Sequence, residues 1–102
     1  MHPRLTIVHD PDLDEIDRAF VEETLVRTLE KVDLHLHGEH RLKAVYKQSN
    51  KDGLRRKTEV HLSLEGSGRS FRAVSSDWKV RLATTEACKT LEGEVDRSHR
   101  HE

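Results

Sequence analysis

Histidine is the residue type that first suggests chemistry, because the chain carries eight histidines in 102 residues. His35, His37 and His40 lie closest together, and a zinc site needs three or four converging ligands, usually with cysteine or a carboxylate among them. On a strand, His35 and His37 would share one face and His40 would lie off it. The single cysteine, Cys88, lies at a position spaced as on a buried helix stripe. The sequence therefore favours neither a metal site nor a cofactor.

No catalytic motif stands out in the sequence. Cys88 lies near Ala87 and Leu91 at helical spacing, which is typical of a small buried thiol, whereas a reactive cysteine needs an exposed and electropositive setting. The acidic residues at 12–17 suit the positive end of a helix dipole. No GxSxG, Walker-type or HExxH motif occurs, and the glycine turn at residues 66–68 joins two strands. We therefore expect no enzyme and no small-molecule substrate.

The basic residues are more informative than the histidines. The net charge is −1, but residues 40–81 hold eleven basic and four acidic residues, whereas residues 1–39 hold four basic and ten acidic ones. A ligand responds to the local potential, so the basic middle third is a candidate footprint for nucleic acid. The alternative is a solvated sheet face that an acidic helix balances. The charges alone leave both interpretations open.

Aromatic residues restrict the kind of nucleic acid that the chain could bind. They make up 4% of the sequence, and most fall at expected core positions, with Tyr46 as the exception. Stacking on single-stranded bases is therefore not expected. What remains is recognition of folded RNA by shape and phosphate contacts, as in double-stranded RNA modules that set helices against a small sheet.

Length and composition indicate one small domain. A chain of 102 residues supports a single hydrophobic core, which we expect over residues 1–97 with a flexible tail at 98–102. No apolar run approaches the roughly 20 residues that span a bilayer. The N-terminus has no signal-peptide pattern, and one cysteine fits a reducing compartment. We expect a cytoplasmic protein with no membrane partner.

Hydrophobic patterning predicts the first two elements. A short strand is expected at residues 4–8, followed by a helix that continues to about Val32. Asp10 is the expected N-cap, with Pro11 at the first helical position. The expected buried stripe of this helix is Val21, Leu25, Leu29 and Val32, with Leu13, Ile16 and Phe20 covering its first turns.

Three further strands and a second helix complete the predicted domain. The strands lie at residues 41–48, 57–65 and 69–75, and the short turns between them predict an antiparallel meander. Residues 75–77 supply caps for a helix that ends near Arg97. Its expected buried stripe is Trp78, Leu82, Ala83, Ala87, Cys88, Leu91 and Val95. The order β-α-β-β-β-α predicts an α+β fold with both helices on one face of a four-stranded sheet.

Three segments of the second half resemble a known family. They are residues 57–64 (KTEVHLSL), residues 70–78 (SFRAVSSDW) after a glycine turn, and residues 87–92 (ACKTLE) within the second helix. Together they resemble the ribosome hibernation-promoting factors, which include the ribosome-associated translation inhibitors once described as sigma-54 modulation proteins. The short tail is similar to the short form of that family.

The resemblance implies a domain akin to the double-stranded RNA-binding fold. It also implies a stress-response factor that binds the ribosomal RNA of the small subunit and occludes the channel for messenger and transfer RNA. The RNA-binding residues that it implies are Arg27, Lys31, Lys47, Lys79, Arg81 and Lys89. The alternative is a protein-interaction module on the same fold that uses its acidic first helix without binding ribosomes. Weak self-association through the sheet edge also stays open.

Overall fold

The computed structural model describes residues 3–9, 13–51, 55–66 and 68–100. Along the chain the elements are β1 (Leu5–His9), α1 (Glu15–Asp33), β2 (Arg41–Lys51), β3 (Arg55–Gly66), β4 (Arg69–Asp77) and α2 (Val80–Arg100). This order confirms the predicted α+β fold. Neither described helix has the length and apolar character that crossing a membrane requires.

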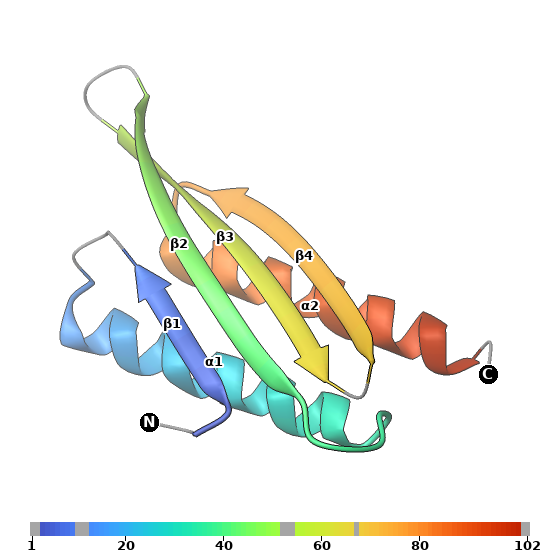
Figure 1. Cartoon of the computed structure of the whole chain (residues 1–102). Helices are drawn as coiled ribbons and strands as arrows, with labels where there is room; N and C mark the ends of the chain where they lie inside the picture. The colour runs from blue at the N-terminus through green and yellow to red at the C-terminus, as the bar shows by residue number, and fades with distance from the viewer. Residues whose placement is uncertain (1–2, 10–12, 52–54, 67, 101–102) are drawn as a thin grey trace.

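The four strands form one mixed sheet in the order β1-β2-β3-β4. β1 runs parallel to β2, with Leu5 opposite Leu42, because α1 provides the long crossover that a parallel pair needs. β2 is antiparallel to β3, and β3 is antiparallel to β4, which confirms the predicted meander. Both helices lie on the same side of the sheet, and the other face is left open (Figure 1).

The core lies between the sheet and the two helices. Successive side chains of a strand point to opposite faces, so alternate residues of β2 and β3 reach the helices. The buried residues of these strands are Leu42, Ala44 and Tyr46, and Val60, Leu62 and Leu64. The stripe predicted for α1, Val21, Leu25, Leu29 and Val32, is also buried. Tyr46, expected as the exposed aromatic, lies in this core with its hydroxyl 2.7 Å from the hydroxyl of Thr84.

The start of α1 differs from the prediction. Its N-cap is Asp14, whose carboxylate accepts a hydrogen bond from the backbone N–H of Asp17 at 2.7 Å. The predicted cap at Asp10 is therefore wrong, and residues 10–12 lie outside the described part of the chain. Ile16 is 71% exposed because it does not share the helix face of Val21. Leu13 is half-buried against the core, as predicted for the first turns, whereas Phe20 is half-buried between the two helices.

The buried stripe of α2 also differs from the prediction. β4 extends to Asp77 and α2 begins only at Val80, so Trp78 lies in the connection between them and is 40% exposed. Leu82 is 49% exposed, because it lies off the face that carries the buried residues. Those residues are Ala83, Thr84, Ala87, Cys88, Leu91 and Val95. The helix continues past Arg97 to Arg100, and the flexibility of the tail stays a prediction.

β2 and β3 extend beyond their neighbours at one end of the sheet. Pairing of β1 with β2 ends at Tyr46, and pairing of β3 with β4 ends at Thr58. Pairing of β2 with β3 continues to Lys51 opposite Arg55. The two strands therefore project as a ribbon from the end of the sheet where β4 turns into α2 (Figure 1). We call this part, residues 47–51 and 55–57, the projecting ribbon.

Candidate nucleic-acid interface

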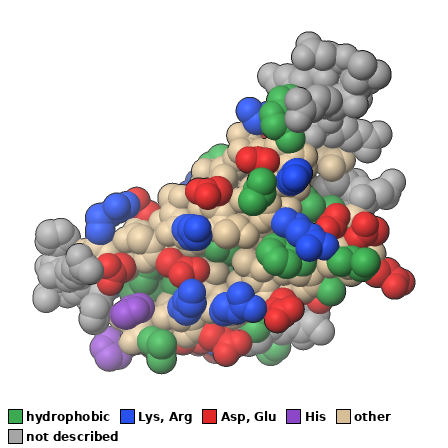
Figure 2. Space-filling model, turned by 180° about the vertical axis from the view of Figure 1, so that it is seen from behind, with side chains coloured by type: hydrophobic (Ala, Val, Ile, Leu, Met, Phe, Trp, Pro, Cys, Tyr) green, Lys and Arg blue, Asp and Glu red, His purple; other side chains and the backbone are tan. Residues whose placement is uncertain are grey.

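Three of the expected RNA-binding residues meet in a groove between the two helices. α1 contributes Arg27 and Lys31, which lie one turn apart and so share a face, and α2 contributes Lys89. The groove has a volume of about 330 Å³, and Phe20 is among its other lining residues. We call it the interhelical groove. It lies on the side of the molecule shown in Figure 2, where basic and acidic side chains alternate over the helices.

Carboxylates engage two of these cations. Arg27 Nη2 lies 3.3 Å from Glu23 Oε1, and Lys31 Nζ lies 3.4 Å from Glu92 Oε1. The other oxygen of Glu92 accepts a hydrogen bond from the hydroxyl of Thr28 at 2.7 Å, which fixes that carboxylate. Exposed ion pairs of this kind are worth about 0–1 kcal/mol, so a phosphate can replace the carboxylate at small cost.

Lys89 and Lys79 differ from these two because neither has an ion-pair partner within the described part of the chain. Lys79 lies in the connection that precedes α2, and both side chains are exposed. An exposed lysine without a carboxylate neighbour can meet a phosphate with no ion pair to break. These two residues are therefore the cations most available to an anionic ligand.

Arg81 lies on the first turn of α2 and is held against α1. Its Nε donates a hydrogen bond to Asp17 Oδ1 at 2.7 Å, and its guanidinium lies 5.1 Å from the centroid of the Phe20 ring. Because Phe20 also lines the interhelical groove, Arg81 continues the basic surface toward the start of α2. Five expected residues thus lie on the side of the helices.

Lys47 is not brought together with the other five. Tyr46, its neighbour on β2, points into the core, so the side chain of Lys47 lies on the open face of the sheet, opposite Glu59 in the strand register. The strand alternation predicted in the sequence already carried this signal, because it set Lys47 on the other side from Tyr46.

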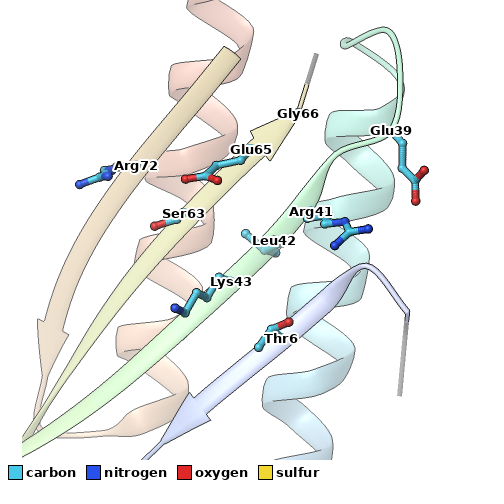
Figure 3. A pocket seen from close by; sticks show the side chains of 9 residues that line it. All are labelled: Thr6, Glu39, Arg41, Leu42, Lys43, Ser63, Glu65, Gly66 and Arg72. Carbon is cyan, nitrogen blue, oxygen red and sulfur yellow. The ribbon is translucent and has the colours of Figure 1, made fainter. Parts of the chain in front are cut away.

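A second basic surface, not expected as a site, lies on the open face of the sheet. Thr6, Lys43, Ser63 and Arg72 are register neighbours in one row across all four strands. They line a shallow hollow of about 710 Å³ together with Glu39, Arg41, Leu42, Glu65 and Gly66 (Figure 3). Carboxylates lie among the cations of this hollow, as they do over the helices, so its charge is mixed.

The histidines that the structure describes do not assemble a metal site. His40 is fully buried, with Nδ1 3.1 Å from the carbonyl oxygen of Gly38, whereas His35 and His37 are exposed. Among the residues that the structure describes, no cluster of three metal-ligating side chains occurs. The Nε2 atom of His40 has no hydrogen-bond partner there, so this ring acts as a packing group beside Gly66.

The environment of Cys88 does not activate its thiol. Burial raises the pKa of the thiol from 9.0 to about 11, and the hydrogen bond with Thr28 opposes this only in part. The thiolate is the nucleophilic form of cysteine. At neutral pH the side chain therefore stays a protonated, buried thiol.

The fold defines a class of protein: a small α+β module with two helices on one face of a four-stranded sheet. The sequence matches no protein-family model and no curated protein significantly. Solved structures do match the fold. The N-terminal domain of Protein Y from Thermus thermophilus has a TM-score of 0.70 and 23% identity, over 96% of this chain and 99% of that one.

A second solved structure with this fold is a ribosomal subunit interface protein from Coxiella burnetii. Its TM-score is 0.66 and its identity 13%, over 92% of this chain and 94% of that one. The TM-scores of 0.70 and 0.66 show a shared fold. The resemblance to the ribosome hibernation-promoting factors, predicted from three short segments, is thereby confirmed at the level of the fold.

Proposed function

We propose that this chain is a ribosome-associated translation inhibitor of the hibernation type. In this proposal it binds ribosomal RNA of the small subunit in the cytoplasm and occupies the channel for messenger and transfer RNA. The observation that carries the proposal is the shared fold with a ribosomal subunit interface protein over 92% of the chain. Inhibition then needs only steric occlusion and no chemical step.

The side of the helices supplies the proposed contacts with phosphates. Arg27, Lys31 and Lys89 in the interhelical groove, with Lys79 and Arg81 beside it, offer five cations on one side of the molecule. Each phosphate contact releases counterions, so five contacts give a slope of about −4 in log affinity against log salt. A fourfold rise in salt should then weaken binding about 250-fold.

Co-sedimentation with purified small ribosomal subunits tests the proposal. The wild-type chain should sediment with the subunit at low salt and be released as salt rises. The double variant Arg81→Glu with Lys89→Glu should remain in the supernatant. A matched control, Lys43→Glu with Arg72→Glu, makes the same charge change on the open face and should bind like the wild type. Thermal melting confirms that each variant is folded.

Two outcomes contradict the proposal in different ways. If the wild-type chain never sediments with subunits, the function is wrong. If the helix-side variant binds and the open-face variant does not, ribosome binding stands but its surface is wrong. Inhibition is then measured by in vitro translation with an unstructured message, where occlusion predicts loss of initiation.

A second candidate function is a protein-interaction module that uses α1. The observation that favours it is the exposed acidic surface at the start of α1. Asp14 and Glu15 precede the 71% exposed Ile16, and Glu23 follows two turns later. The variant Glu15→Lys with Glu23→Lys separates the two functions. It should strengthen binding to subunits if RNA is the partner, because it removes repulsion from phosphates, and abolish binding to a basic protein if α1 is the docking surface.

A further inference from the structure

The connection between β4 and α2 presents the chain's single tryptophan at the surface. Trp78 is 40% exposed, whereas Tyr46, an aromatic residue of the core, is 1% exposed. It lines a hollow of about 390 Å³, which we call the Trp78 hollow. Its other lining residues are Leu13, Asp17, Gln48, Thr58, Lys79, Val80 and Arg81. An exposed indole in a concave surface can stack against a planar ligand.

Cations from three elements surround this indole. Lys57 of β3 places its Nζ 5.7 Å from the centroid of the Trp78 ring. Lys79 of the connection and Arg81 of α2 line the hollow. The ligand that suits this site therefore combines an aromatic ring with negative charge.

The nearby carboxylates are already engaged. Asp17 accepts the hydrogen bond from Arg81 at 2.7 Å, and Asp77 accepts one from the backbone N–H of Lys79 at 3.0 Å. Neither carboxylate meets the ammonium group of Lys57 or Lys79 at ion-pair distance in the described residues. Lys57 and Lys79 are thus the cations beside the hollow that no described carboxylate pairs with.

The remaining lining fits the edge of a nucleobase. Gln48 and Thr58 are register partners across β2 and β3 at the base of the projecting ribbon, and both line the hollow. An amide and a hydroxyl offer donors and acceptors to a base edge. The volume of about 390 Å³ is near the lower end of the roughly 300–1,000 Å³ of small-molecule sites, which suits one planar group and excludes a double helix.

We propose that the Trp78 hollow receives one unpaired base of single-stranded RNA. The base stacks on the Trp78 indole, its edge meets Gln48 and Thr58, and its phosphates meet Lys79 and Arg81. This proposal departs from the expectation that base stacking plays no part, which followed from placing Trp78 in the core. The inference goes beyond the proposed function, because short RNA tests it without ribosomes.

Intrinsic fluorescence offers a direct test, since Trp78 is the single tryptophan of the chain. A single-stranded RNA of about ten nucleotides should quench and shift its emission saturably, because bases stack on aromatic side chains. A blunt RNA duplex without unpaired bases should produce no such change. Adenosine monophosphate should produce the same quenching only at far higher concentration, because it has one phosphate.

Variants distinguish stacking from a structural role of the tryptophan. Trp78→Leu should weaken binding of a labelled single strand about 5-fold to 150-fold in anisotropy titrations, the range measured for loss of one stacked base, and should leave the salt slope unchanged. Trp78→Phe should retain most of the affinity. Leu82→Ala, at another exposed apolar side chain that does not line the hollow, should bind like the wild type.

Three results would overturn the inference: no response to single strands, an equal response to the duplex, or wild-type affinity in Trp78→Leu. Tight binding of the mononucleotide alone would also overturn it, by assigning a nucleotide site in place of an RNA site. Co-sedimentation separates this inference from the proposed function. If the chain binds subunits but gives no fluorescence response, only the stacking site is refuted. If the chain responds to RNA but never sediments with subunits, only the proposed ribosomal function is refuted.

Discussion

Replacing Gly66 with alanine is expected to destabilise the fold, because the end of β3 lies against the segment that leads into β2. A Cβ atom at Gly66 would lie 2.9 Å from His40 Cα and 3.0 Å from His40 Cδ2, and closer still to the carbonyl oxygen of Glu39. Two of these atoms belong to the backbone, so no side-chain rotation relieves the overlap. Residues 39–40 must move as a segment, together with the buried ring of His40.

Gly66→Ala should lower the free energy of unfolding by about 1–3 kcal/mol, which is typical when extra atoms are forced into a filled site. In a domain of this size each kcal/mol lowers Tm by about 4–8 °C, so calorimetry or urea unfolding resolves the change easily. Gly93→Ala is the matched control, because Gly93 lies inside α2 with no atom within 4 Å of its added Cβ. This variant should gain about 0.5–1 kcal/mol, since alanine favours a helix more than glycine does.

The comparison between the two variants decides the outcome. If Gly66→Ala unfolds at the same urea concentration as the wild type, the contact between the end of β3 and residues 39–40 is wrong. If both variants lose stability equally, the effect belongs to alanine itself and not to the packing around Gly66. Equal m-values for the two variants and the wild type would show that all three unfold by the same two-state transition.

Three further predictions test the core and the cap of α1. The free energy of unfolding should fall between about pH 9 and about pH 11. The pKa of Cys88 is raised from 9.0 to about 11 in the folded state, so the folded chain keeps a proton that the unfolded chain releases. Cys88→Ala should reduce this loss by about 2–3 kcal/mol in melts at these two pH values. Tyr46→Phe should cost about 1–3 kcal/mol by leaving the buried Thr84 hydroxyl unpaired, and adding Thr84→Val should recover most of it; no recovery would show that the hydrogen bond is not the cause. Asp14→Ala should cost about 1 kcal/mol in urea unfolding, and an unchanged midpoint would place the cap elsewhere.

The fold could be predicted from the sequence because local hydrophobic patterns indicate most of its strands and helices. Leu42, Ala44 and Tyr46 alternate with Lys43, Val45 and Lys47, which marks a strand with one buried face. The spacing of Val21, Leu25, Leu29 and Val32 marks a buried helix stripe. The short turns fixed the meander. The parallel pairing of β1 with β2 was not predicted, because orientation across a crossover depends on where the helix packs.

Trp78 shows where local pattern was insufficient. Its spacing to Leu82 matches a helix, but the pairing of Thr58 with Asp77 keeps the chain in β4 until just before it. Strand pairing is a tertiary contact, so the residue that ends β4 is decided by β3 and not by residues 75–78 alone. The same limit hid the Trp78 hollow, which requires α1, β2, β3 and α2 to meet.

The residues of the candidate RNA surface could be predicted from the sequence, but their arrangement in space could not. Arg27 and Lys31 share a helix face by spacing, but their proximity to Lys89 depends on how α1 and α2 pack. The sequence also did not reveal that Glu92 would approach Lys31, because these residues lie far apart in the chain. Lys47 was separable from the rest by strand alternation alone.

The projecting ribbon has a consequence for the solubility of the protein. Beyond Tyr46 and Thr58, neither outer edge of this two-stranded ribbon pairs with another described strand, and such an edge is a template for adding a strand from a second copy. The basic residues that the ribbon carries in sequence are Lys47, Lys51, Arg55, Arg56 and Lys57. Like charges in this stretch of sequence should keep two ribbons apart. Concentrated salt, which would also weaken the proposed binding to RNA, should therefore favour edge-to-edge association between copies.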